Sequence, residues 1–88
     1  MSQTRGAGTE RRNGVQSVER ALEIVTVIAG RGGNATLSEL ASATDLPAAT
    51  VHRLLRTMIS AGYLKQLQDR SYGLSLKFVP IGEAARGR

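Results

Sequence analysis

The stretch from Pro47 to Gly62 constrains the fold of this chain more than any other part of the sequence. Proline can open a helix, because the first backbone N–H groups have no partner inside it, but it disrupts a helix interior. After Pro47, apolar residues recur at positions i, i+3, i+4, i+7 and i+8, which is the spacing of one helix face. These residues are Val51, Leu54, Leu55, Met58 and Ile59. The stretch predicts an amphipathic helix over residues 47–61 that ends at Gly62.

Two further helices are expected before Pro47. Apolar residues three and four positions apart predict a helix that begins with Ser17 as its N-cap and ends at Gly30. Residues 31–35 are rich in glycine and are expected to be a connector. Thr36-Leu37-Ser38-Glu39 matches the capping box, in which each side chain satisfies a free N–H group of the first helical turn. A short second helix then runs to about Thr44 and is followed by a turn.

A β-hairpin is expected after the third helix. Tyr63–Leu67 and Tyr72–Leu76 alternate roughly between apolar and polar residues, and a polar tip over 68–71 joins them. A fourth helix can begin near Phe78, although a proline and a glycine leave its start open. Helix, short helix, tight turn, helix and hairpin predict a mainly α fold with a small β-hairpin. This is a winged helix-turn-helix, with a three-helix core and a two-stranded wing.

The charges of the chain favour a polyanionic partner on one part of the fold. The 88 residues carry 12 basic and 7 acidic side chains, a net charge of +5. Residues 17–49 hold two basic and four acidic side chains (net −2), whereas residues 50–77 hold five basic and one acidic (net +4). The positive charge thus coincides with the third helix and the wing. Only 3% of residues are aromatic, so duplex DNA is favoured over stacking of single strands.

The outward side of the third helix is expected to contact DNA. Ala49, Thr50 and Arg53 lie in its first two turns and are the candidates for base edges, since an arginine can donate two hydrogen bonds to a guanine. Arg56 lies one turn further along and is expected to bind phosphate. The candidate residues of this helix are Ala48, Ala49, Thr50, His52, Arg53, Arg56 and Thr57.

Three other segments are candidate contacts with DNA. The N-terminus of the second helix presents polar side chains, the wing has a basic tip, and residues 1–16 are expected to form a disordered basic arm. The candidates are Thr36 and Ser38 in the second helix, Lys65, Arg70 and Ser71 in the wing, and Arg5, Arg11 and Arg12 in the arm.

Catalysis, metals, cofactors and membranes are not indicated. The chain has no cysteine and a single histidine, His52, so no set of metal ligands or nucleophile–base pair can be assembled. No apolar run is long enough for a membrane span, and a cytoplasmic protein is expected. The alternative to DNA binding is a winged helix used for protein–protein contact, but the basic third helix favours DNA.

At these residues the sequence resembles the N-terminal winged helix-turn-helix of the IclR family of bacterial transcription regulators. The likeness covers about residues 17–79, and its most specific block is Leu46–Leu55. The other matching blocks are Ser17–Leu22, Leu37–Ala41 and Gly62–Leu64. One departure is Gly73, since the family more often has a bulkier residue after the tyrosine and a glycine after the leucine.

The resemblance implies more than the residues themselves indicate. It implies a homodimer, or a tetramer in the full-length regulator, that binds a palindromic operator as a repressor or activator. It also implies that a small-molecule effector binds a C-terminal domain outside these residues. The expected organisation is a basic arm over 1–16, a DNA-binding domain over 17–79, and the start of a linker to the effector-binding domain over 80–88.

Overall fold

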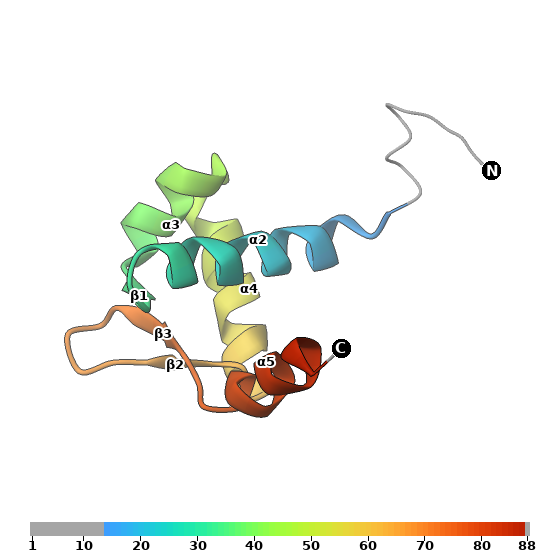
Figure 1. The fold of residues 1–88 in the computed structure, drawn as a ribbon. Coiled ribbons are helices and arrows are strands. Elements are labelled where there is room, and N and C mark those ends of the chain that lie inside the picture. Colours follow the sequence, from blue (N-terminus) through green and yellow to red (C-terminus); the bar gives the residue numbers. More distant parts are fainter. Residues whose placement is uncertain (1–13, 88) are drawn as a thin grey trace.

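The fold is a three-helix core with a small sheet on one side, in a computed structural model that describes residues 14–87 (Figure 1). This is the predicted winged helix-turn-helix, so the expected fold class is confirmed. The elements, in chain order, are α2 Gln16–Gly30, β1 Asn34–Ala35, α3 Leu37–Thr44, α4 Ala48–Ser60, β2 Leu64–Gln66, β3 Tyr72–Leu74 and α5 Phe78–Arg86.

Helix α4 forms where the proline and the apolar spacing predict it. Pro47 is the N-cap, with φ −59°, and its carbonyl accepts a hydrogen bond of 3.1 Å from the backbone N–H of Val51. Val51, Leu55 and Met58 are buried. The chain turns away after Ala61 because Gly62 has a φ of +91°, a left-handed conformation that glycine adopts without steric cost. One side of α4 is therefore buried over its whole length.

The turn between α3 and α4 is short because Asp45 adopts a left-handed conformation, with φ 57° and ψ 39°. Short polar side chains tolerate this region better than other non-glycine residues. The next N–H, of Leu46, donates to the carbonyl of Ala41 at 3.2 Å, which satisfies one of the free carbonyls at the end of α3. The half-buried side chain of Leu46 packs against the core. The turn thus sets the direction in which Pro47 starts α4.

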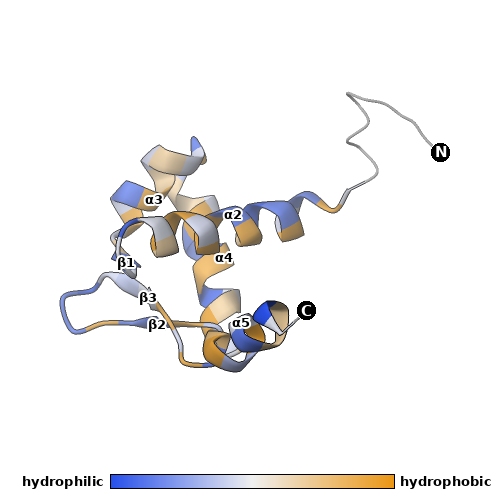
Figure 2. Cartoon of the chain, in the orientation of Figure 1, coloured by the Kyte–Doolittle hydropathy of each residue, from blue (hydrophilic) through white to orange (hydrophobic). Residues whose placement is uncertain are grey.

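The hydrophobic core lies where α2, α3 and α4 meet. Five side chains are fully buried there: Ile24, Ile28, Leu40, Val51 and Leu55. Tyr72 and Leu64 of the sheet close the core from below, with 5% and 2% of their surface exposed. Figure 2 shows the consequence on α2, which has hydrophilic residues along one side and hydrophobic residues along the other.

The sheet has three strands, one more than the sequence predicts. Its order is β1-β3-β2 with antiparallel pairing, and Gly73 lies between Asn34 of β1 and Lys65 of β2. The additional strand, β1, lies within residues 31–35, which were expected to be a connector. The sequence does not reveal it because a strand of two residues is too short to show a periodic pattern. A Cβ atom at position 73 would lie 3.2 Å from the carbonyl oxygen of Gly33, so glycine allows the close approach of β1.

The ends of several elements differ from the prediction. Ser17 is not the N-cap of the first helix, which begins at Gln16 with no side-chain cap on its N-cap residue, Val15. The two wing strands end at Gln66 and Leu74, earlier than expected. Helix α5 does form, because Pro80 falls in its first turn, where backbone N–H groups need no partner within the helix. The expected domain boundary at residue 79 therefore falls inside α5.

Replacing the buried Leu55 by alanine is expected to lower the free energy of unfolding by about 2–5 kcal/mol, because it removes apolar contacts and leaves a cavity. Urea denaturation measures the change. The matched control is Leu76→Ala, since Leu76 is 79% exposed, and its effect should stay within about 0.5 kcal/mol. Equal losses for both variants would contradict the placement of the core.

Candidate nucleic-acid interface

The exposed side of α4 carries two arginines. Arg53 and Arg56 are both exposed, as is His52 between the buried positions. The side-chain ion pairs found among residues 14–87 use Arg31 and Arg86 and leave both α4 guanidinium groups available. An arginine without an acidic partner keeps its full charge and its donors for a ligand. This side of α4 can therefore bind an anion or read hydrogen-bond acceptors.

The small residues of the first turn leave room beside these arginines. Ala48 and Ala49 are exposed, and Thr50 is half-buried at the edge of the packed side. Side chains this short allow the backbone of α4 to approach another molecule closely. The N-terminal half of α4 thus combines an unobstructed surface with the guanidinium group of Arg53.

Thr57 is exposed on α4, and its contact with DNA stays a prediction. It also lines a hollow next to α2 together with Val18, Ala21 and Met58. Its hydroxyl donates a hydrogen bond of 3.1 Å to the carbonyl of Arg53. Its place beside α2 has a geometric cause, because Thr57 follows Arg56 by about 100° around the helix and so reaches the flank that α2 approaches.

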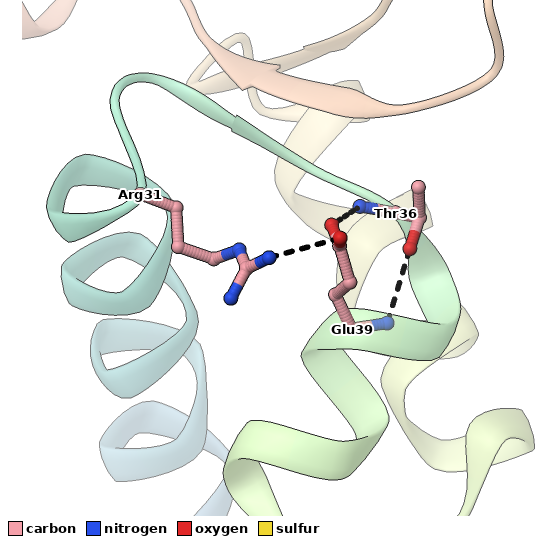
Figure 3. Close-up of polar contacts among 3 residues, drawn as sticks. All are labelled: Arg31, Thr36 and Glu39. Carbon is pink, nitrogen blue, oxygen red and sulfur yellow. Dashed lines mark hydrogen bonds and ion pairs between the residues drawn. The ribbon is translucent and has the colours of Figure 1, made fainter.

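The N-terminus of α3 is fixed by the predicted capping box and by an arginine (Figure 3). The backbone N–H of Thr36 donates to Oε1 of Glu39 at 2.9 Å, and the N–H of Glu39 donates to Oγ1 of Thr36 at 3.1 Å. Nη2 of Arg31 lies 2.9 Å from Oε2 of the same glutamate. The sequence pattern revealed the box but not the part of Arg31, which comes from the connector after α2.

This network ties the end of α2 to the start of α3, the helix that braces α4. The hydrogen bond from the backbone of Thr36, with the charge of Arg31 beside it, lowers the pKa of Glu39 below its ordinary value of 4.5. The side chains of Thr36 and Ser38 remain exposed at the same helix end. The two candidates of the second helix are therefore accessible, although the Thr36 hydroxyl also serves as an N-cap.

The wing tip is held rigidly by its own side chains. Oδ1 of Asp69 accepts hydrogen bonds from the backbone N–H and the hydroxyl of Ser71, at 2.9 and 2.6 Å. These bonds lower the pKa of Asp69. Nε2 of Gln66 donates to the carbonyl of Arg70, which has a left-handed φ of 73°. Arg70 and Lys65 are exposed, and so both remain available.

Ser71 does not take the place expected for it. Only 4% of the residue is exposed, and its hydroxyl is engaged by Asp69. A buried hydroxyl with a partner stabilises the turn and has no free path to a ligand. We therefore correct the expectation that Ser71 is a DNA-contacting residue of the wing.

The C-terminal end of α4 is fastened by residues that the sequence analysis did not single out. Nζ of Lys77 donates to the carbonyl of Ala61 at 3.2 Å and lies 4.6 Å from the centre of the Tyr63 ring. The hydroxyl of Ser75 donates to the carbonyl of Gly62 at 2.6 Å. These contacts join positions 13 and 16 residues apart, so no short-range sequence pattern predicts them. Lys77 therefore helps to cap the C-terminal end of α4 while it remains exposed.

The arginines of the expected arm, Arg5, Arg11 and Arg12, lie outside residues 14–87, which the structure describes. Within that range, no three His, Cys, Asp or Glu side chains gather as metal ligands would. No helix in the same part of the chain has the length and apolar character to cross a membrane.

The three-helix core, the wing and the basic side of α4 define a winged helix-turn-helix of the DNA-binding type. The model of the IclR helix-turn-helix domain matches residues 17–68, more than half of the chain. The chain therefore belongs to the IclR family of transcription regulators.

Relatives with known names are consistent with this family. Over 55 residues the chain is 43% identical to the transcriptional repressor IclR of Escherichia coli K12, covering 62% of the chain and 20% of that protein. It is 38% identical over 72 residues to the probable HTH-type transcriptional regulator ArcR of Halobacterium salinarum, covering 82% and 27%. The chain thus spans about a fifth to a quarter of these relatives.

Solved structures share the fold. An IclR family transcriptional regulator from Brucella abortus superposes with a TM-score of 0.79 at 30% identity, over 93% of this chain and 32% of that one. HmgR of Pseudomonas aeruginosa superposes with a TM-score of 0.73 at 32% identity, over 81% and 30%.

The cap of α3 provides a test with a defined pH dependence. Thr36→Ala should lower the free energy of unfolding by about 0.5–2 kcal/mol, because an N-cap acceptor is lost. A carboxyl group whose pKa is lower in the folded state than in the unfolded chain stabilises the fold at pH values above its ordinary pKa. This stabilisation is lost as the pH falls through the lowered pKa. The stability advantage of the wild type over Glu39→Gln should therefore shrink as the pH falls below 4.5.

Thermal unfolding followed at a series of pH values measures this difference. Glu23→Gln is a matched control, since Glu23 is exposed on α2 and takes no part in the cap of α3. A gap between wild type and Glu39→Gln that stays constant as the pH falls well below 4.5 would show that the carboxylate of Glu39 does not stabilise α3.

Proposed function

We propose that this chain is the operator-recognition domain of a transcription regulator and that α4 enters the major groove of double-stranded DNA. The observation that carries the proposal is the pair Arg53 and Arg56, exposed on a helix whose other side buries Val51, Leu55 and Met58. A helix held in this way presents its free side as a rigid surface. The width of the major groove admits one α-helix.

The candidate residues in the first turns of α4 have distinct roles in this proposal. Arg53 reads a guanine through O6 and N7, and the short side chains of Ala48 and Ala49 let the helix approach the base edges. Thr50 contacts a base or a thymine methyl group from the edge of the packed side. Arg56 binds phosphate, and His52 flanks it. Phosphate contacts set the orientation of the domain, whereas base contacts set the preferred sequence.

The neighbouring elements add contacts with the DNA backbone. Thr36 and Ser38 lie at the N-terminus of α3, where N–H groups and the helix dipole favour a phosphate. Lys65 and Arg70 extend from the wing towards the backbone or the minor groove. The arm residues Arg5, Arg11 and Arg12 are proposed to add to the binding as a basic segment.

The proposal extends to the whole regulator. Two copies of the domain would occupy the two halves of a palindromic operator, since a two-fold symmetric protein matches a two-fold symmetric site. A small-molecule effector would act through a further domain, and the protein would act in the cytoplasm without catalysis of its own. A winged helix that only contacts proteins is the competing function, but the exposed arginines of α4 favour DNA.

Arg53→Ala and Arg56→Ala should weaken binding in different ways. Loss of Arg53 should cost about 1–3 kcal/mol on the preferred duplex and relax the preference at one base pair. Loss of Arg56 should weaken all duplexes alike and reduce the slope of log K against log salt by about one. Fluorescence anisotropy at several salt concentrations, with a duplex selected from a random pool and a scrambled one, measures both effects.

The control for these variants is Arg86→Ala, because Arg86 lies on α5 and pairs with Glu83. Its binding should match that of the wild type. Equal losses on the selected and scrambled duplexes for Arg53→Ala would remove Arg53 from the reading role. A wild-type chain whose binding shows no dependence on salt would contradict the proposal and support the protein-contact alternative.

A further inference from the structure

The tip of the wing holds an arginine at a backbone position that favours glycine. The backbone N–H of Arg70 donates to the carbonyl of Leu67 at 2.9 Å, and the N–H of Leu67 donates to the carbonyl of Ser71 at 2.8 Å. This pairing is typical of a hairpin in which a β-turn is followed by one left-handed residue, usually glycine. Arg70 has a φ of 73° and fills that place.

The left-handed conformation is unfavourable for an arginine. It brings Cβ of an L-residue too close to the following carbonyl oxygen, and besides glycine mainly asparagine and aspartate adopt it. Within residues 14–87, the other non-glycine residue with a positive φ is Asp45, whose short polar side chain suits this region. Strained residues persist where the surrounding structure fixes them, and they gather at functional sites. The conformation of Arg70 therefore points to a function for its side chain.

Hydrogen bonds fix the peptide groups on both sides of Arg70. Nε2 of Gln66 donates to its carbonyl at 3.2 Å, and Oδ1 of Asp69 accepts the N–H of the next residue, Ser71, at 2.9 Å. Together with the bond from its own N–H to Leu67, these contacts hold the left-handed backbone. None of the three bonds uses the guanidinium group. The side chain of Arg70 therefore leaves the wing in one direction, with donors that the turn does not need.

Asp69 shapes the turn without pairing with the arginine beside it. Its Oδ1 also accepts the hydroxyl of Ser71 at 2.6 Å, and Ser71 is only 4% exposed. The ion pairs found within residues 14–87 do not include Arg70, which is exposed. A carboxylate that paired with Arg70 would compete with phosphate for the guanidinium group. Asp69 therefore acts on the backbone of the tip and leaves Arg70 available to a ligand.

We propose that Asp69 and Gln66 are positioning residues for DNA binding, which hold Arg70 in its left-handed conformation so that its guanidinium group meets the duplex. Figure 1 shows the β2–β3 hairpin projecting past the helices, so its tip is accessible to a large partner. A tip that is already ordered loses less entropy when it binds. The inference rests on the proposed function and deepens it, because it names the residues that order the wing contact and a cost to the stability of the fold.

Two substitutions of Arg70 test the cost of its conformation. Arg70→Gly and Arg70→Ala both remove the guanidinium group, but only glycine relieves the strain at a positive φ. Arg70→Gly should therefore unfold at a higher temperature than the wild type and about 4 °C or more above Arg70→Ala. Both variants should bind the selected duplex about threefold or more weakly than the wild type. Unfolding of Arg70→Gly below Arg70→Ala, or binding by either variant at the wild-type level, would overturn the inference.

A matched pair of Asp69 variants tests the positioning. Asp69→Asn and Asp69→Ala remove the same charge, but asparagine keeps an oxygen that can accept the hydrogen bonds of Ser71. Asp69→Ala should bind the duplex about threefold or more weakly than Asp69→Asn, because the tip must then be ordered on binding. This difference should vanish in an Arg70→Gly background. It should persist in a Lys65→Ala background, since the backbone of Lys65 is held by its pairing with Gly73.

Fluorescence anisotropy measures the binding, at a temperature at which circular dichroism shows every variant folded. Gln66→Ala should weaken binding in the same direction as Asp69→Ala. Equal binding by the two Asp69 variants, with a wild type that binds the duplex, would overturn the inference and leave the proposed function intact. A difference that persists in the Arg70→Gly background would also overturn it, because Asp69 would then not act through Arg70. A wild type that binds no duplex would contradict the proposed function and this inference together.

Discussion

The burial of one side of α4 is the interaction on which the rest of the structure depends. Val51 and Leu55 are fully buried against Ile24 and Ile28 of α2 and Leu40 of α3. Because a helix turns by about 100° per residue, burying these positions forces the intervening ones outward. The packing that stabilises the domain is therefore also what presents Arg53 and Arg56. The core therefore fixes the backbone positions of both arginines, and their side chains need no packing contacts for this.

The ends of the helices are held by polar contacts that satisfy free backbone groups. The side chains of Glu39 and Thr36 accept hydrogen bonds from free backbone N–H groups at the start of α3, and Asp45 ends this helix in a left-handed conformation. Lys77 and Ser75 donate hydrogen bonds to the backbone carbonyls that follow α4. Unpaired backbone groups are costly when they are shielded from water. The contacts of Ser75 and Lys77 also join segments far apart in the chain, so they fix the direction of the chain as well as satisfying hydrogen bonds. Together they keep α4 in one orientation relative to α2, α3 and the wing.

The domain separates its charged and apolar surfaces. The basic side of α4 and the wing suit a polyanion, whereas an apolar hollow lined by Ala21 of α2, Met58 of α4 and Ile81 of α5 lies elsewhere on the domain. On an 88-residue chain the two surfaces share α4, which contributes Arg56 to one and Met58 to the other. Changes in the packing of α4 would therefore affect both.

The sequence by itself determined the elements whose signals are local. The spacing of apolar residues set the helices, Pro47 set the start of α4, and the capping box set the start of α3. The likeness to the IclR family was visible in the same blocks. The exposure of Arg53 and Arg56 also followed, since the periodicity alone assigns them to the side opposite the buried residues.

Only the tertiary structure decided the features that depend on residues far apart in the chain. Strand β1, the ion pair of Arg31 with Glu39, the cap by Lys77 and the burial of Ser71 all need a partner that no short-range pattern reveals. The exposure of Leu22 is a further example, because this residue belongs to an apolar stripe that looks like core, yet Ile24 and Ile28 already fill the core. The spacing of apolar residues predicts which face of a helix is apolar, but only the packing of neighbouring elements decides whether that face is covered.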